Sequence, residues 1–391
     1  MVELGEPGTS LASSSAGDQA MAANSPSCAA AASYSPFPAG DRGTDGWRST
    51  AAGRLPPCVF MTGVSGNPRA FMPGVRCIIH QLRRHNSRVP LVVAASDESH
   101  AHVTTDLSSR GLLGANVSLL RWGRFPVDAS IYRVKYGWRW SGSRVLDKLN
   151  VLGAPYRRVV WLDADVHIQR NVDELCDALP DATRRLAAAF NSGHEPRTCW
   201  QPGKNPAADE CRGCRHHGVT KDEREGGYWV RTGLAEQDAG KRRGLKRCVY
   251  EVNSGVLVVA PHNQSAFRSE VVAPVACGRV VSRDGSDQGA LNSLVHGHGA
   301  LGGRPAPLHP SYNAVMRNAM TRPSAWRRWN PAIVHLVGPR KPWSAAAQKD
   351  ALAKPHDPYL LEERRWLKSC QQFAPDTSSN RSARLQARAG G

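Results

Sequence analysis

The sequence predicts an α/β fold with a mixed, mostly parallel central sheet flanked by helices. Residues 157–168 (RRVVWLDADVHI) form an apolar run with β-branched and aromatic side chains on both faces, which is typical of a buried central strand. Residues 58–62, 73–84 and 90–95 have the patterns of a strand, a helix and a second strand in close succession. Because such a βαβ unit builds parallel sheets, we expect the central strand to belong to one.

The rest of the chain continues this alternation of strands and helices. Apolar runs predict further strands at residues 117–122, 187–190, 249–260 and 332–337. Residues 253–255 (Asn-Ser-Gly) are expected to interrupt the third of these strands, because Asn and Gly are depleted in strands. Helices are predicted at residues 143–152, from residue 171 onward, and at residues 269–276, 290–295 and 359–370.

Composition divides the chain into three regions. Residues 1–54 are rich in Ala, Ser, Gly and Pro and are predicted to be disordered, because they cannot bury enough apolar surface to offset chain entropy. Residues 55–345 are predicted to form one folded domain, with a polar insert at residues 191–247 that contains Cys and His. Residues 346–391 are expected to form a C-terminal helix and a frayed tail.

The chain is strongly basic, with 51 Lys and Arg against 33 Asp and Glu and a net charge of +18. Nucleic acid is nevertheless not the expected partner, because the arginines are scattered and are rarely interleaved with aromatic residues. Residues 132–140 do interleave them, and there a helix or loop over the sheet is favoured over base stacking. A basic surface would also attract an anionic substrate such as a sugar nucleotide.

Sequence features give a first expectation about the compartment. The chain contains no apolar run long enough to cross a membrane, and its start lacks the basic and apolar regions of a signal peptide. A cytoplasmic location is expected, with the Golgi lumen as the alternative if the start is mis-assigned and an anchor precedes it. The ten cysteines are too widely spread for a small disulfide scaffold. Whether the protein forms a homo-oligomer is left open.

Two aspartates, Asp163 and Asp165, follow the apolar part of the central strand. The C-terminal ends of strands are where open α/β sheets bind ligands. Two carboxylates there suit a hard divalent cation that also holds a diphosphate. On its own the Asp-x-Asp pattern is more simply explained as an N-capping or surface pair.

Three further stretches accompany this motif in a fixed order. The four are residues 160–165 (VWLDAD), 252–258 (VNSGVLV), 284–292 (DGSDQGALN) and 334–343 (VHLVGPRKPW). Together they resemble the glycogenin-like glycosyltransferases, family 8 of the enzymes with a GT-A nucleotide-diphospho-sugar transferase fold. The similarity extends over roughly residues 56–345.

The resemblance implies a metal site formed by Asp163, Asp165 and His335. The metal would be Mn²⁺, with Mg²⁺ as the alternative, and it would bridge the phosphates of a UDP-sugar donor. An imidazole ligand favours Mn²⁺ over Mg²⁺. Without the resemblance, a single His at a strand end is more simply explained as a core residue.

The resemblance also implies donor contacts and two catalytic residues. Asp287 and Gln288 would lie beside the donor sugar, one contacting its hydroxyl groups and one near the anomeric carbon. The other implied donor-binding residues are Thr62, Lys148, Asp163, Ala164, Asp165, Asn253, Ser254, Gly255, Asp284, Gly338 and Lys341. Read locally, residues 284–288 could instead cap a helix, residues 253–255 could be a plain bulge, and Lys148 could be a solvated helix residue.

The function implied is a retaining hexosyltransferase that moves a glucosyl, galactosyl or glucuronosyl group from a UDP-sugar to a carbohydrate or other hydroxyl acceptor. Front-face attack is favoured over a covalent intermediate, for which Asp287 is the candidate nucleophile. The alternative from another class is a catalytically inactive GT-A module that binds a glycan or protein partner. That alternative predicts a broken metal triad, whereas all three ligands are present.

The chain departs from the family at two places. Residues 61–71 fit the uracil-contacting segment poorly, and Thr62 is the single candidate there. Residues 314–326 contain no Tyr, so the self-glucosylating tyrosine of true glycogenins has no counterpart. The chain therefore resembles the plant- and algal-type relatives, which glucuronidate xylan or make galactinol, more than true glycogenin.

The polar insert contains a cluster of potential metal ligands, namely Cys199, Cys211, Cys214, His216 and His217. A Cys-x-x-Cys pair with nearby His can bind zinc. A disulfide and an unliganded loop on the acceptor side are the alternatives, and the resemblance favours a role in acceptor choice.

Overall fold

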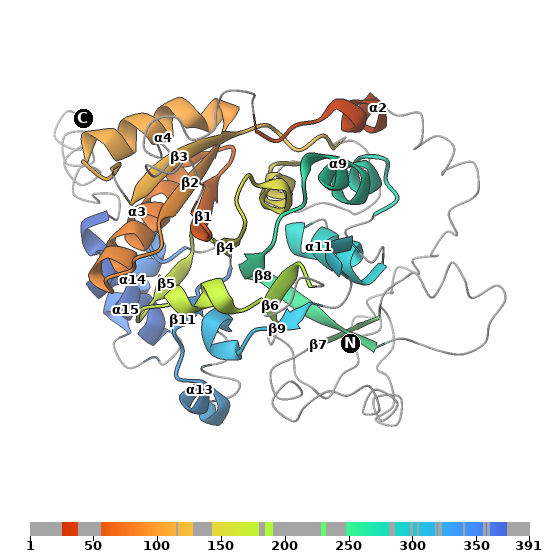
Figure 1. Cartoon of the computed structure of the whole chain (residues 1–391). Helices are drawn as coiled ribbons and strands as arrows, with labels where there is room; N and C mark the ends of the chain where they lie inside the picture. Colours follow the sequence, from red (N-terminus) through yellow and green to blue (C-terminus); the bar gives the residue numbers. More distant parts are fainter. Residues whose placement is uncertain are drawn as a thin grey trace, which may run out of the picture.

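The computed structural model describes residues 26–37, 56–114, 116–127, 143–179, 184–190, 228–231, 248–280, 286–297, 300–302, 305–316, 319, 323–338, 341–354, 357 and 360–373. These residues form an α/β structure in which an eight-stranded sheet carries helices on both faces (Figure 1). The predicted fold class, a mixed and mostly parallel sheet flanked by helices, is confirmed.

Seven strands of this sheet lie in the order β3-β2-β1-β4-β8-β6-β9, and β7 pairs with β8 outside that path. β1, β2, β3 and β4 are parallel to one another, whereas β8 runs antiparallel to β4, β6 and β7. The bounds are β1 Val59–Val64, β2 Leu91–Ser96, β3 Val117–Trp122, β4 Val159–Leu162, β6 Leu186–Phe190, β7 Tyr228–Arg231, β8 Cys248–Val259 and β9 Ala306–Pro307. The central strand predicted from residues 157–168 is β4, between β1 and β8.

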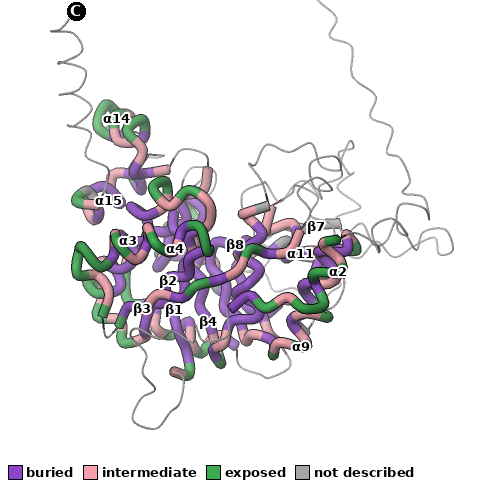
Figure 2. Tube along the Cα trace, turned by 90° about the horizontal axis from the view of Figure 1, so that it is seen from above, coloured by how far each residue is buried: buried purple, intermediate pink, exposed green. Residues whose placement is uncertain are grey.

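Each face of the sheet is covered by its own set of helices. Along β4, Val159 and Trp161 face one hydrophobic cluster and Val160 and Leu162 the other, which is why this strand is apolar throughout. One face is covered by α3 (Pro68–Arg84), α4 (Asp97–Ser109) and the short 3₁₀ helix η2 (Asp173–Asp177). The other is covered by η1 (Ser143–Gly153), α9 (Gln264–Phe267), η4 (Arg268–Val272), α10 (Ala273–Ala276) and α11 (Asp287–Gly297). Figure 2 shows the buried strands between these half-exposed helices.

A second, three-stranded sheet continues from the end of β4. Its order is β10 (Ala314–Val315), β11 (Ile333–His335) and β5 (Val166–Ile168). β5 follows β4 after a turn of three residues and pairs antiparallel with β11, so that His335 lies opposite Val166. This pairing brings residue 335 beside the aspartate turn, far away in the sequence.

The expectation that residues 1–54 lack structure is wrong for residues 26–37. Pro26–Ser33 form the helix α2, and Cys28 is disulfide-bonded to Cys277 at the end of α10. The Tyr34 hydroxyl donates to Asn150 Oδ1 at 2.8 Å, and Gly123 N–H donates to the Pro36 carbonyl oxygen at 2.7 Å. The segment is held by contacts to distant parts of the chain, which its own composition does not indicate.

The C-terminal region is more ordered than a single helix. α13 (Pro323–Trp329) precedes β11, and α14 (Ala345–Ala353) precedes α15 (Leu361–Cys370), the helix predicted at residues 359–370. The last described residues form the short helix η8 (Gln371–Phe373). Cys370 is disulfide-bonded to Cys77 of α3, and a third disulfide joins Cys58 to Cys176.

The irregularity expected at residues 253–255 lies within β8, which is continuous through them. Ala188 of β6 pairs with Leu257 and Phe190 pairs with Val252, so the register shifts across residues 253–255, and none of these three residues pairs with β4 or β6. The helix at residues 143–152 is a 3₁₀ helix.

Several expectations fall outside the described residues: the aromatic and basic segment 132–140, and the Cys and His residues of the insert, Cys199, Cys211, Cys214, His216 and His217. None of the helices that the structure describes has the length and apolar character needed to span a lipid bilayer.

Candidate functional site

Asp163 and Asp165 lie where the chain leaves β4 and turns into β5. Val166 N–H donates to the Asp163 carbonyl oxygen at 3.2 Å and closes this turn. Leu336 N–H donates to the Asp165 carbonyl oxygen at 2.9 Å, which ties the turn to the end of β11. The backbone therefore fixes both aspartates against the strand end that carries His335.

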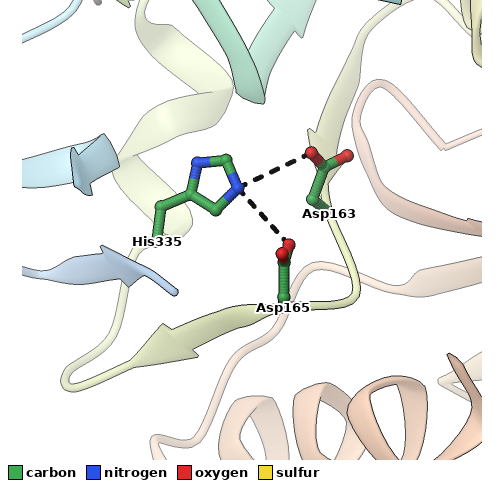
Figure 3. Close-up of side chains that lie close together, drawn as sticks. All are labelled: Asp163, Asp165 and His335. Carbon is green, nitrogen blue, oxygen red and sulfur yellow. Dashed lines mark ion pairs between the residues drawn. The ribbon is translucent and has the colours of Figure 1, made fainter. Parts of the chain in front are cut away.

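The three predicted metal ligands converge (Figure 3). His335 Nε2 lies 3.3 Å from Asp165 Oδ1 and 3.8 Å from Asp163 Oδ2. One ligand atom from each residue lies within 4.8 Å of the other two, and this is the one such group within the described part of the chain. Two carboxylate oxygens and an imidazole nitrogen form a donor set that can hold a divalent metal ion.

Two lysines neutralise the carboxylates. Lys148 Nζ of η1 lies 2.7 Å from Asp163 Oδ1 and 2.8 Å from Asp287 Oδ2, so it bridges the central turn and the first turn of α11. Lys341 Nζ lies 2.5 Å from Asp165 Oδ2. Each aspartate of the pair therefore has its own lysine partner.

Burial and these charges shift the carboxyl pKa values in opposite directions. Burial raises the pKa of Asp165, but His335 and Lys341 lower it by more, so that pKa lies below its ordinary value. Burial also raises the pKa of Asp163, and there the opposing effect of Lys148 does not cancel the rise. Asp165 is therefore the more firmly ionised member of the pair.

Trp161, which the sequence did not single out, orients Asp163. Its indole Nε1–H donates to Asp163 Oδ1 at 2.7 Å, and its ring stacks on Trp122 with the centroids 5.8 Å apart. Trp161 and Asp163 are two residues apart and so share one face of the chain. Because Oδ1 accepts from Trp161 and Lys148, Oδ2 is the oxygen turned toward His335.

Residues 253–255 and α11 meet directly beside this turn. Asp163 N–H donates to the Gly255 carbonyl oxygen at 2.8 Å, and Ser254 N–H donates to Gln288 Oε1 at 3.3 Å. Gln288 and Asp287 therefore lie close to the aspartate turn. Ser254 and Asn253 are both buried.

The structure describes three of the four remaining predicted residues. Thr62 is fully buried in β1, and its Oγ1 has no hydrogen-bond partner among the described residues. Ala164 is the middle residue of the aspartate turn, and Gly338 lies beyond β11 with a φ of 130°. Asp284 lies outside the described residues.

Comparisons with known proteins place the chain near glycosyltransferases of known structure. No protein-family model and no curated protein matches it. It is similar to the galactosyltransferase LgtC in complex with donor and acceptor sugar analogs, at 17% identity and a TM-score of 0.46, over 83% of this chain and 99% of LgtC. It is also similar to mouse xyloside xylosyltransferase 1, at 14% identity and a TM-score of 0.40, over 71% and 96% of the two chains.

A third similar structure belongs to a longer protein, the bifunctional glycosyltransferase WbbM. The identity is 15%, the TM-score is 0.46, and the match covers 79% of this chain but only 51% of WbbM, so the chain spans about half the length of that protein. With TM-scores below 0.5, these similarities do not decide the activity of the chain, and its function is inferred from the site itself.

Proposed function

We propose that the protein is a metal-dependent glycosyltransferase that moves a hexosyl group from a UDP-sugar to a hydroxyl group. The observation that carries the proposal is the convergence of Asp163, Asp165 and His335 at the C-terminal end of β4, between Lys148 and Lys341. This end of an α/β sheet is where such folds bind ligands. A cation held by carboxylates, with further lysines beside it, matches the charge of a diphosphate.

Asp163, Asp165 and His335 would hold Mn²⁺, with Mg²⁺ as the alternative. When bound, the metal supplies positive charge that stabilises the departing nucleotide diphosphate. Lys341 lies within ion-pair distance of Asp165, which supports the proposal that its ammonium group binds an oxygen of the same diphosphate. Gly338 belongs to the segment that leads to this lysine.

The sugar and nucleoside would occupy the space beside the metal ligands. Asp287 and Gln288 are proposed to serve as catalytic residues at the sugar. The other residues proposed to line the donor are Thr62, Lys148, Ala164, Asn253, Ser254, Gly255 and Asp284. Support comes from the contacts that join β8, α11 and the aspartate turn.

Transfer with retention is proposed to follow front-face attack. The bond between the anomeric carbon and the phosphate oxygen breaks while the acceptor oxygen bonds to that carbon, and the acceptor's proton passes to the departing phosphate oxygen. A covalent route would need Asp287 as nucleophile. Because Asp287 Oδ2 lies 2.8 Å from Lys148 Nζ, its charge is partly neutralised, which makes it a poorer nucleophile and supports the front-face route.

The decisive experiment measures UDP release by the purified protein with UDP-glucose, UDP-galactose and UDP-glucuronate, each with Mn²⁺ or with EDTA. We expect one donor to be preferred, with activity abolished by EDTA and lowered about 100-fold or more in Asp165→Ala, because several kcal/mol of charge stabilisation are lost. Asp177→Ala, an exposed position on η2, is the matched control. Activity that persists in EDTA would exclude the metal-dependent reaction.

If no donor is turned over, the thermal shift on adding UDP and Mn²⁺ separates two cases. Stabilisation by UDP with Mn²⁺ would mean that the donor site is intact and the acceptor is missing. No stabilisation would favour the inactive module that binds a glycan or protein partner.

We further propose that the protein works in an oxidising compartment such as the Golgi lumen, instead of the cytoplasm expected from the sequence. Cys28–Cys277, Cys58–Cys176 and Cys77–Cys370 are disulfide-bonded. Disulfides persist in the secretory pathway and are rare in cytosolic proteins. If intact cells are treated with an alkylating reagent, mass spectrometry should find these six cysteines unmodified. Alkylated cysteines at these positions would contradict the proposal.

A further inference from the structure

The two ring nitrogens of His335 face different surroundings. Nε2 points toward the carboxylates of Asp163 and Asp165. Nδ1 points away from them and lies 3.1 Å from Asn253 Oδ1 and 3.0 Å from Asn313 Oδ1. Both asparagines are buried, and neither is one of the three candidate metal ligands.

A backbone donor fixes which way both amides point. Gly255 N–H can only donate, and it lies 2.9 Å from Asn253 Oδ1, so this atom is the amide oxygen. Asn313 Nδ2 donates to the same oxygen at 2.8 Å. If the Asn313 amide were reversed, two oxygens would face each other, so Asn313 must present Oδ1 to His335.

These orientations determine the tautomer of His335. Nδ1 faces two amide oxygens, which only accept hydrogen bonds, so Nδ1 must carry the hydrogen. In the neutral ring Nε2 is then an acceptor with its lone pair directed at the carboxylate oxygens of Asp163 and Asp165. A lone pair and two carboxylates facing one another attract a cation between them.

We propose that Asn253 and Asn313 are positioning residues that hold His335 in the tautomer whose Nε2 binds the cation. The inference rests on the proposed metal-dependent function and extends it to residues that do not contact the metal. Asn313 reaches this position because the 3₁₀ helix η6 (Pro310–Asn313) runs directly into β10, which pairs with β11 beside His335. Residues that fix the second nitrogen of a metal-binding histidine are expected to affect metal affinity.

The first test is direct and needs no metal. Two-bond ¹H–¹⁵N correlation spectra of metal-free protein labelled with [¹⁵N]histidine report which nitrogen carries the hydrogen, and comparison with His335→Gln identifies the residue 335 signals among the 14 histidines. We expect the Nδ1–H form in the wild type and a mixture of both forms in Asn313→Leu. A wild-type ring that carries its hydrogen on Nε2 would overturn the proposal.

The second test measures the Mn²⁺ dissociation constant by titration calorimetry. Asn313→Leu should raise it about 10- to 100-fold, which is the usual effect of removing such a supporting residue. Asn313→Asp keeps an acceptor for Nδ1–H but turns its second oxygen toward Asn253 Oδ1, so it should recover only part of the affinity. Asn150→Leu removes an equally buried amide that bonds Tyr34 and Gly123 and none of the metal ligands, and it should leave the constant unchanged.

The two tests distinguish failure of this inference from failure of the proposed function. If the wild type binds no Mn²⁺, the metal-dependent function is wrong, while the spectra still decide the tautomer. If the wild type binds Mn²⁺ and Asn313→Leu binds it equally well, the positioning role is wrong and the metal site stands. The positioning role would also be wrong if Asn313→Asp recovered none of the affinity and Asn150→Leu lost it equally. Asn313 would then act only as a structural residue.

Discussion

The position of the His335 ring depends on Gly255 having no side chain. A Cβ at residue 255 would lie 2.1 Å from His335 Cε1 and 2.2 Å from Nδ1, much closer than real contacts allow. The ring is enclosed by buried residues and cannot move aside without leaving the carboxylates. Glycine at this strand position therefore reflects the close approach of a functional side chain.

We predict that Gly255→Ala displaces His335 and lowers Mn²⁺ affinity by at least about tenfold, as expected when a ligand is misplaced. Calorimetric titration with Mn²⁺ measures the change. Gly111→Ala is the control, because an added Cβ there meets nothing within 4 Å and its φ of 60° adds backbone strain far from the site. Equal Mn²⁺ binding by Gly255→Ala and the wild type would contradict the observed geometry.

A second prediction concerns Trp161. Trp161→Phe keeps an aromatic ring against Trp122 but loses the Nε1–H bond to Asp163 Oδ1. A hydrogen bond to a charged group contributes about 1.5–3 kcal/mol, so Mn²⁺ binding should weaken by roughly tenfold or more. Trp122→Phe is the matched control, because Trp122 Nε1 is buried without a hydrogen-bond partner among the described residues. The idea fails if both variants bind Mn²⁺ alike.

At the level of single residues, the sequence indicated the charged residues of the site but not the side chains that position them. Asp163, Asp165 and His335 are brought together as the resemblance implied, and their role as metal ligands stays a proposal. Trp161 and Asn313 were missed because an indole in a strand and an amide after a turn have many ordinary explanations. Their contacts depend on which distant residues fold against them, and no local sequence pattern indicates this.

At the level of the elements, the 3₁₀ helix η1 positions Lys148 at the site. The preceding residue, Asp147, fixes this helix in place. Asp147 is fully buried; its Oδ1 accepts from Phe125 N–H at 2.8 Å, and its Oδ2 has no hydrogen-bond partner among the described residues. Burial raises the pKa of this carboxyl to about 6. The folded state is therefore less stable when Asp147 is ionised, because burial penalises the charged form by more than the hydrogen bond from Phe125 N–H stabilises it.

This raised pKa predicts a pH dependence of stability. Between about pH 4 and pH 6 the folded state retains a proton on Asp147 that the unfolded state has lost, so the free energy of unfolding falls as the pH rises through this window. Asp147→Asn keeps an acceptor for Phe125 N–H and has no such loss. It should match the wild type near pH 4 and exceed its stability by up to about 3 kcal/mol above pH 6, as measured by urea unfolding. A difference that stays constant with pH would contradict the prediction.

The elements also show where sequence patterns are informative. The strands β1, β2, β3 and β4 were predictable because fully buried parallel strands are apolar on both faces. α2 was not, because an Ala- and Ser-rich helix has no apolar face and is held by a disulfide and by Tyr34. The irregularity in β8 was predictable from the low strand propensity of Asn and Gly: residues 253–255 pair with neither β4 nor β6, although the strand continues through them.

For the whole molecule, the three disulfides predict strong dependence on oxidation. Each closes a long loop, and removing one such bond typically lowers the free energy of unfolding by about 2–5 kcal/mol. Dithiothreitol should therefore lower the melting temperature clearly, and the double variant Cys58→Ala/Cys176→Ala should reproduce part of that effect without reductant. Peptide mapping under non-reducing conditions should recover the three linked pairs. Six free thiols at these positions would contradict the prediction.

Two of these disulfides also give the fold a connection that does not run along the peptide chain. Cys28–Cys277 and Cys77–Cys370 each join a cysteine before residue 191 to one after residue 247. A protease site engineered into the stretch between β6 and β7 would divide the polypeptide into two pieces, with Asp163 and Asp165 on one and His335 on the other. The oxidised pieces would migrate as a single molecule until a reductant was added. The three candidate metal ligands would thus stay in one covalent unit after the backbone between them had been cut.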